Sequence, residues 1–129
     1  MNPIQAILEQ HPTLNDYGFG EYGIKNTAET EASLQRDRTS LLNSTERFET
    51  TCTWILNNLQ MQKTLNHKRT SCGLKHVAEH DIDYITNGLF ITAMLHLHYS
   101  WEQASLGTNA VFNVSEKSLR LLEKNQQTK

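Results

Sequence analysis

The stretch YITNGLFITAMLHLHY, residues 84–99, is the longest apolar-rich part of the chain and decides the fold. Apolar side chains fall on most sides of a helix drawn through it, which is typical of a helix at the centre of a domain. The sequence therefore predicts a central helix over about residues 82–98. Gly88 lies inside this helix, where glycine costs about 1 kcal/mol relative to alanine. We therefore expect another backbone to approach Gly88 closely.

Further helical patterns surround the central segment. Four apolar residues spaced by four, three and four positions predict a helix over roughly residues 45–62. They are Phe48, Cys52, Ile55 and Leu59. Shorter helices are expected over residues 3–10, 71–80 and 115–124, while AVFNV at residues 110–114 favours one short extended segment. The predicted fold class is all-α, a single compact bundle of about five helices around the central helix.

The length of 129 residues suits one domain of ordinary size, so we expect residues 1–129 to form a single domain. Residues 1–27 are expected to hold a short helix and a loop rich in glycine and aromatic residues. Residues 28–62 are expected to be helical, and residues 70–124 to form a helical core unit.

Charge is distributed unevenly along the chain. The formal net charge of −2 does not by itself predict a polyanionic partner. Residues 50–78, however, carry four basic side chains and no acidic one. A basic loop at residues 63–69 followed by a helix N-terminus favours phosphate binding. The predicted nucleic-acid-binding residues are Lys63, Lys68, Arg69, Ser71, Lys75 and His76.

A second interpretation is binding to a protein. Residues 1–49 carry eight acidic and four basic side chains, so the N-terminal part of the chain is acidic. Aromatic residues expected at the surface would add contact area. The candidates are Tyr22, Tyr99 and Trp101. The protein would then be an adaptor or inhibitor without direct contact to nucleic acid.

Catalysis is a third and less favoured interpretation. His76, Glu79 and His80 follow the H-x-x-E-H order of inverted zinc proteases, with the two histidines on one helix face. Those enzymes are larger and use a further glutamate far downstream, whereas the glutamates that follow here are close by. Cys72 lies near a helix N-terminus beside His76, but no acid that orients the imidazole is visible. We therefore expect neither an enzyme, nor a metal site, nor a cofactor.

The cysteines and the N-terminus bear on the compartment. Cys52 and Cys72 form neither a disulfide framework nor a Cys-x-x-Cys pair, so free thiols in a reducing compartment are expected. The start of the chain lacks the basic and long apolar regions of a signal peptide. The segment at residues 84–99 is too short and too polar to span a bilayer. The sequence thus predicts a cytoplasmic protein that does not associate with membranes.

Residues 70–119 resemble small proteins encoded on bacterial plasmids, phages and integrated elements. The resemblance is carried by TSCGLKHVAE, YITNGLFITAML and TNAVFNVSEKSLRLLE. It implies a protein of the bacterial accessory genome with a fixed helical unit, in which Lys75, His76, Asn87 and Gly88 stand at matching positions. Residues 1–69 carry no such resemblance.

The leading prediction is therefore a small non-enzymatic binding protein of the bacterial accessory genome. Its expected partner is nucleic acid or a complex that contains nucleic acid, contacted through the basic loop. The alternative is a protein adaptor or inhibitor, for example one that acts against host defence. The third interpretation is an enzyme that uses Cys72 with His76, or a metal site at His76 and His80.

Overall fold

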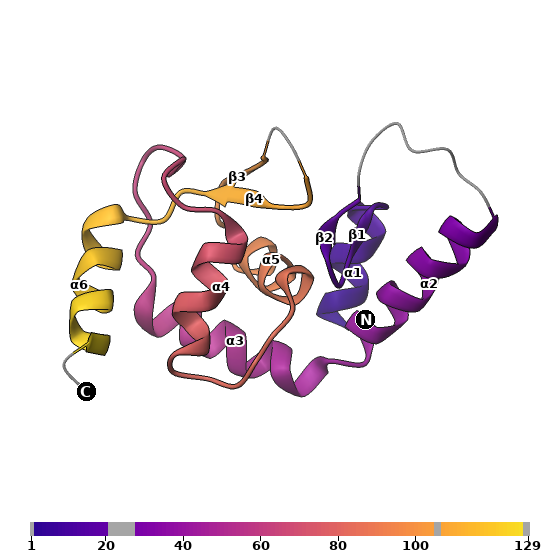
Figure 1. Cartoon of the computed structure of the whole chain (residues 1–129), viewed down its shortest axis with the longest axis horizontal. Coiled ribbons are helices and arrows are strands. Elements are labelled where there is room, and N and C mark those ends of the chain that lie inside the picture. The colour runs from indigo at the N-terminus through magenta and orange to yellow at the C-terminus, as the bar shows by residue number, and fades with distance from the viewer. Residues whose placement is uncertain (1, 21–27, 105–106, 128–129) are drawn as a thin grey trace.

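The computed structural model describes residues 2–20, 28–104 and 107–127 (Figure 1). Over these ranges the chain forms six helices and two antiparallel pairs of short strands. The helices are α1 (Pro3–Gln10), α2 (Ala28–Leu42), α3 (Thr45–Asn58), α4 (Ser71–Glu79), α5 (Asn87–His96) and α6 (Glu116–Gln127). The strands are β1 (Leu14–Asn15), β2 (Gly18–Phe19), β3 (Trp101–Gln103) and β4 (Ala110–Phe112).

The prediction of an all-α bundle of about five helices is wrong, because the fold mixes helices with two small sheets. Strands β1 and β2 have two residues each, too few for any alternation of polar and apolar side chains to be visible. A turn forms this hairpin: the Asn15 side chain accepts from the backbone N–H of Tyr17 at 2.9 Å, and Gly18 has a φ of 118°. Strand β4 falls in the segment where an extended stretch was expected, and it pairs with β3.

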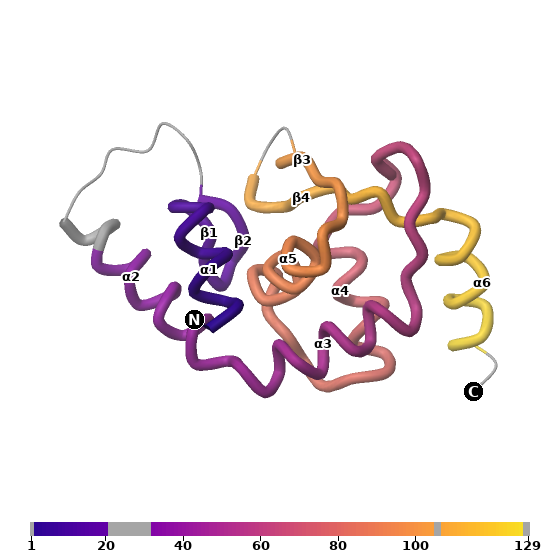
Figure 2. Tube along the Cα trace, turned by 180° about the vertical axis from the view of Figure 1, so that it is seen from behind, coloured from indigo at the N-terminus to yellow at the C-terminus, as the bar shows by residue number. Residues whose placement is uncertain are grey.

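Helix α5 lies at the centre, packed against α1, α3, α4 and the β1–β2 hairpin. Every residue from Gly88 to Leu95 is buried. The helix is shorter than the predicted residues 82–98, because it begins only after its N-cap residue, Thr86. Its hydroxyl accepts from the backbone N–H of Leu89 at 3.1 Å. Both views place α5 between α2 at one end of the molecule and α6 at the other (Figures 1 and 2).

The expected close approach at Gly88 is confirmed. Its backbone N–H donates to the carbonyl oxygen of Asp16 at 3.0 Å, and a Cβ built on it would overlap the carbonyl of Asn15. The glycine thus lets the turn of the β1–β2 hairpin lie directly against the start of α5.

Helix α3 supplies the second large part of the core and ends at Asn58 rather than near residue 62. Its buried residues follow the predicted face, with Phe48 and Ile55 fully covered and Cys52 half-buried. Trp54 is also buried, and its indole N–H donates to Asp81 Oδ2 at 2.9 Å. This bond ties α3 to the irregular segment that follows α4.

One cluster of buried apolar side chains runs from Ile4 in α1 to Leu119 in α6. Within the described ranges, no helix has the length and apolar character needed to cross a membrane. The expected surface aromatic Tyr22 lies outside the described residues.

Candidate functional site

The predicted basic surface is partly consumed by ion pairs. Arg69 Nε and Nη2 each lie 3.0 Å from the carboxylate of Glu116, and Nη2 lies 2.6 Å from Glu123 Oε1. The hydrogen bonds to Glu116 and Glu123 raise the pKa of Arg69, and the bond from Arg69 lowers the pKa of Glu116 to about 2. Arg69 therefore fastens the loop to α6, and two carboxylates offset its charge.

Two further members of the predicted set are buried. Ser71 is fully covered, and its hydroxyl accepts from the backbone N–H of Ala110 at 3.0 Å. Lys75 is 6% exposed, and its ammonium lies 3.0 Å from Glu79 Oε1. The same ammonium lies 4.9 Å from the ring centroid of Tyr84, a cation–π distance. Neither residue presents a free polar group to a phosphate.

The remaining members, Lys63, Lys68 and His76, are exposed. Lys63 and Lys68 make no ion pair with any residue that the structure describes. The structure thus leaves three of the six predicted residues open to solvent. The basic loop is a weaker cationic surface than its sequence indicates.

The histidines of the H-x-x-E-H motif have different neighbours. His76 Nδ1 lies 3.1 Å from Glu79 Oε1, whereas His80 Nδ1 lies 3.3 Å from Asp81 Oδ1. Across residues 2–20, 28–104 and 107–127, no group of three or more His, Cys, Asp or Glu side chains is arranged to hold a metal ion. The motif is therefore divided between two separate carboxylate contacts.

Helix α4 supplies an acid, Glu79, that orients His76. Sequence reasoning missed this role of Glu79. Cys72 Sγ lies 3.7 Å from His76 Nε2, and His76 Nδ1 lies next to Glu79. The spacing of four and then three residues places the three side chains along one helix face. Glu79 is shared, because it also binds Lys75 and accepts from the backbone N–H of Ile85 at 3.1 Å.

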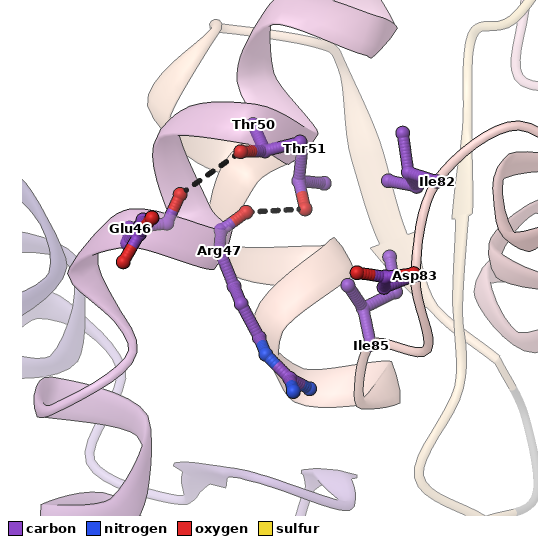
Figure 3. A pocket seen from close by; sticks show the side chains of 7 residues that line it. All are labelled: Glu46, Arg47, Thr50, Thr51, Ile82, Asp83 and Ile85. Carbon is purple, nitrogen blue, oxygen red and sulfur yellow. Dashed lines mark hydrogen bonds between the residues drawn. The ribbon is translucent and has the colours of Figure 1, made fainter.

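A groove runs between α3 and the segment at residues 80–86. Its first part is a pocket of about 260 Å³, with α3 on one side and Ile82, Asp83 and Ile85 on the other (Figure 3). Its second part is an open pocket of about 440 Å³ further along α3. Thr50 and Ile82 line both parts, so we treat them as one surface, the α3 groove.

The α3 groove carries more negative than positive charge. Glu46, Glu49 and Asp83 line it, and the one basic residue among its lining residues is Arg47. Arg47 Nη1 donates to the carbonyl oxygen of Tyr84 at 2.8 Å, so the guanidinium holds the opposite wall. The apolar side chains that line the groove are Trp54, Ile82 and Ile85. An acidic groove with apolar surface suits a basic, amphipathic partner.

A third pocket, the tyrosine pocket, opens where the β1–β2 turn, α2, α4 and the start of α5 meet. It measures about 280 Å³ and is lined by Asp16, Tyr17, Asp37, Lys75, Tyr84, Thr86 and Asn87. Tyr17 and Tyr84 are 69% and 64% exposed, the largest exposed aromatic surfaces among the described residues. Such exposed aromatic surface is typical of interfaces.

Sequence reasoning missed the α3 groove and the tyrosine pocket, and it misplaced the surface aromatic residues. Tyr84 was expected in the central helix but lies in the irregular segment before it, exposed. Tyr99 was expected at the surface but is 5% exposed, with its hydroxyl donating to the carbonyl of Leu59 at 2.7 Å. Trp101 is 38% exposed and stacks on Phe19 with ring centroids 5.1 Å apart. Tyr17 was expected in the loop rich in glycine and aromatic residues, and it lies in the turn between β1 and β2.

Comparison of the chain with protein-family models, with curated proteins and with solved structures finds no match. The resemblance to proteins of bacterial mobile elements therefore stays a prediction.

Proposed function

We propose that this protein is a non-enzymatic binding protein that acts through contact with another protein. The α3 groove is the docking surface, and its occupant is a basic, amphipathic segment of the partner. The observation that carries the proposal is the charge of the groove: Glu46, Glu49 and Asp83 line it together with a single arginine, which is already hydrogen-bonded. The resemblance to mobile-element proteins adds the further proposal that the partner is a host protein in the bacterial cytoplasm.

The contrast with the basic loop supports protein over nucleic acid as the partner. Phosphate binding relies on several cationic side chains acting together. In the predicted set, Arg69 is paired with two glutamates and Lys75 with one. Nucleic-acid binding remains the second candidate, because Lys63 and Lys68 are exposed and unpaired within the described residues.

A photo-crosslinking amino acid at Thr53, in the α3 groove, tests the first candidate in bacterial cells. The matched control carries the same group at Lys63, in the basic loop. We expect a discrete protein adduct from position 53 that disappears when Glu49→Lys removes the excess negative charge of the groove. Adducts from position 63 alone, or an adduct at position 53 that survives Glu49→Lys, would contradict docking in the groove.

A titration against single- and double-stranded DNA and RNA tests the second candidate. Both protein and nucleic-acid contacts weaken with salt, so the variants make the distinction. Binding that is lost in the double variant Lys63→Ala/Lys68→Ala, but kept in Glu49→Lys, would establish the basic loop as the functional surface.

A further inference from the structure

We propose that the tyrosine pocket binds a guanidinium group, supplied by an arginine side chain of the protein partner. This inference rests on the proposed function and names the contact that would give the interface its specificity. It is carried by the charges and the aromatic surfaces of the pocket.

The pocket has an excess of negative charge. Asp16 and Asp37 both line it, and the positive charge of Lys75 is offset by Glu79, 3.0 Å away. Arg38, next to Asp37 in sequence, does not compensate, because its guanidinium donates to carbonyl oxygens of the N-terminal segment at 2.8–3.1 Å. Asp16 Oδ1 already accepts from the Thr86 hydroxyl at 3.1 Å, so Asp37 is the main carboxylate for a cationic ligand and Asp16 adds its charge.

The open acceptor in this pocket is the carboxylate of Asp37, which makes no ion pair with a described residue. Asn87 Nδ2 donates to the carbonyl of Tyr17 at 2.9 Å and to Asn109 Oδ1 at 3.1 Å, which fixes the orientation of the amide. Its Oδ1 has no hydrogen-bond partner among the described residues but is fully buried, so a ligand does not reach it. Cationic N–H donors suit the Asp37 carboxylate, whereas a phosphate or carboxylate does not.

The aromatic surfaces select for a planar cation. The Lys75 ammonium already lies near the Tyr84 ring, which shows that this ring accommodates positive charge. More than half of the surface of Tyr84 and of Tyr17 remains open to solvent. A guanidinium stacks on such rings and also presents a fork of donors to a carboxylate, which an ammonium does not.

The size and the place of the pocket fit a side chain of a docked protein. Its volume of about 280 Å³ lies just below the range of small-molecule sites, so one long side chain is a suitable occupant. Tyr84 lines this pocket, its neighbour Ile85 lines the α3 groove, and Arg47 of the groove binds the Tyr84 carbonyl. A single partner segment can therefore fill the groove and place an arginine between the tyrosines.

The test uses the whole chain and two probes of the same shape, the N-acetyl amides of arginine and of citrulline. Citrulline keeps the length and the planar end of the side chain but lacks the charge, and it has three N–H donors and a carbonyl in place of the five donors of arginine. We expect saturable shifts of amide resonances around Tyr17 and Tyr84 with arginine, and an affinity about tenfold weaker with citrulline. Asp37→Asn should weaken arginine binding about fivefold or more, since one charge-assisted contact is lost.

The control variant is Glu102→Gln, which removes an equal charge from an exposed side chain that lines neither the α3 groove nor the tyrosine pocket and should leave arginine binding unchanged. Equal affinities for the two probes, or arginine binding that Asp37→Asn does not alter, would overturn the inference. If the Thr53 adduct forms while arginine does not bind, the guanidinium pocket fails and docking in the groove stands. If arginine binds but no adduct forms, the pocket stands and the groove proposal fails.

Discussion

Arg69 and Glu116 form a two-point contact, with Nε 3.0 Å from Oε1 and Nη2 3.0 Å from Oε2. The contact joins the loop before α4 to the first turn of α6. Both side chains are about four-fifths covered, so solvent screens the pair less than it screens an exposed one. Arg69, one of the six residues predicted to bind nucleic acid, thus holds the loop against α6.

Replacing Arg69 with alanine should destabilise the fold, because Glu116 and Glu123 would lose their counter-charge. We expect the free energy of unfolding to fall by roughly 2 kcal/mol. The matched variant Lys68→Ala removes an exposed charge from the same loop and should change stability by less than about 0.5 kcal/mol. Urea titrations followed by circular dichroism measure both, and equal effects would show that Arg69 does not hold the loop against α6.

The same contact makes stability depend on pH. Hydrogen bonds from Arg69 and Asn66 lower the pKa of Glu116 from 4.5 to about 2. A lowered pKa in the folded state means that the stabilisation is complete above pH 4.5 and is lost as the pH falls towards 2. The free energies of unfolding of wild type and Glu116→Gln should therefore differ at pH 6 and converge near pH 2. A difference that stays constant over this pH range would contradict the lowered pKa of Glu116.

Substitution of Gly88 with alanine should be strongly destabilising, although alanine is the better helix former. The added Cβ would overlap the carbonyl of Asn15, so the hairpin turn must separate from α5, at a cost of roughly 3 kcal/mol. Gly73→Ala in α4 is the control, since a Cβ there meets Thr70 Oγ1 at an ordinary 3.6 Å. That variant should be neutral or more stable by up to about 1 kcal/mol. Thermal unfolding of both proteins gives the comparison.

The two cysteines should differ in their reaction with iodoacetamide. Burial, and then the charge of Glu49, raise the pKa of Cys52 to about 11. Its thiolate fraction at pH 8 is therefore about a hundredfold below that of a thiol with the ordinary pKa of 9.0. Cys72 is placed 3.7 Å from His76 Nε2, which can accept its proton. Peptide mass spectrometry should find Cys72 alkylated first, and more slowly in His76→Ala. Faster labelling of Cys52 would contradict this.

The features that followed from the sequence are those set by local spacing. The spacing of Phe48, Ile55 and Leu59 identified the buried face of α3, and the apolar-rich stretch at residues 84–99 identified α5 as the centre. Gly88 was informative for the same reason, because a glycine inside an apolar helix has few causes other than close packing.

The features that did not follow depend on partners distant in the chain. Arg69 and Glu116 are 47 positions apart, and no local pattern indicates that a basic loop will be neutralised. The start of α5 was misjudged because Tyr84 and Ile85 continue its apolar pattern, while the Thr86 cap sets the boundary. The α3 groove and the tyrosine pocket form where this irregular segment meets α3 and the β1–β2 turn, so they could be found only from the fold.

Side chains from neighbouring helices, rather than a backbone ladder, hold the segment at residues 80–86. Trp54 binds Asp81, Arg47 binds the carbonyl of Tyr84, and Glu79 accepts from the N–H of Ile85. The wall shared by the groove and the tyrosine pocket is therefore preorganised before any partner arrives. Little conformational entropy is then lost when a partner binds, so the affinity depends mainly on the contacts made at the interface. The association rate is also not limited by the ordering of a loop.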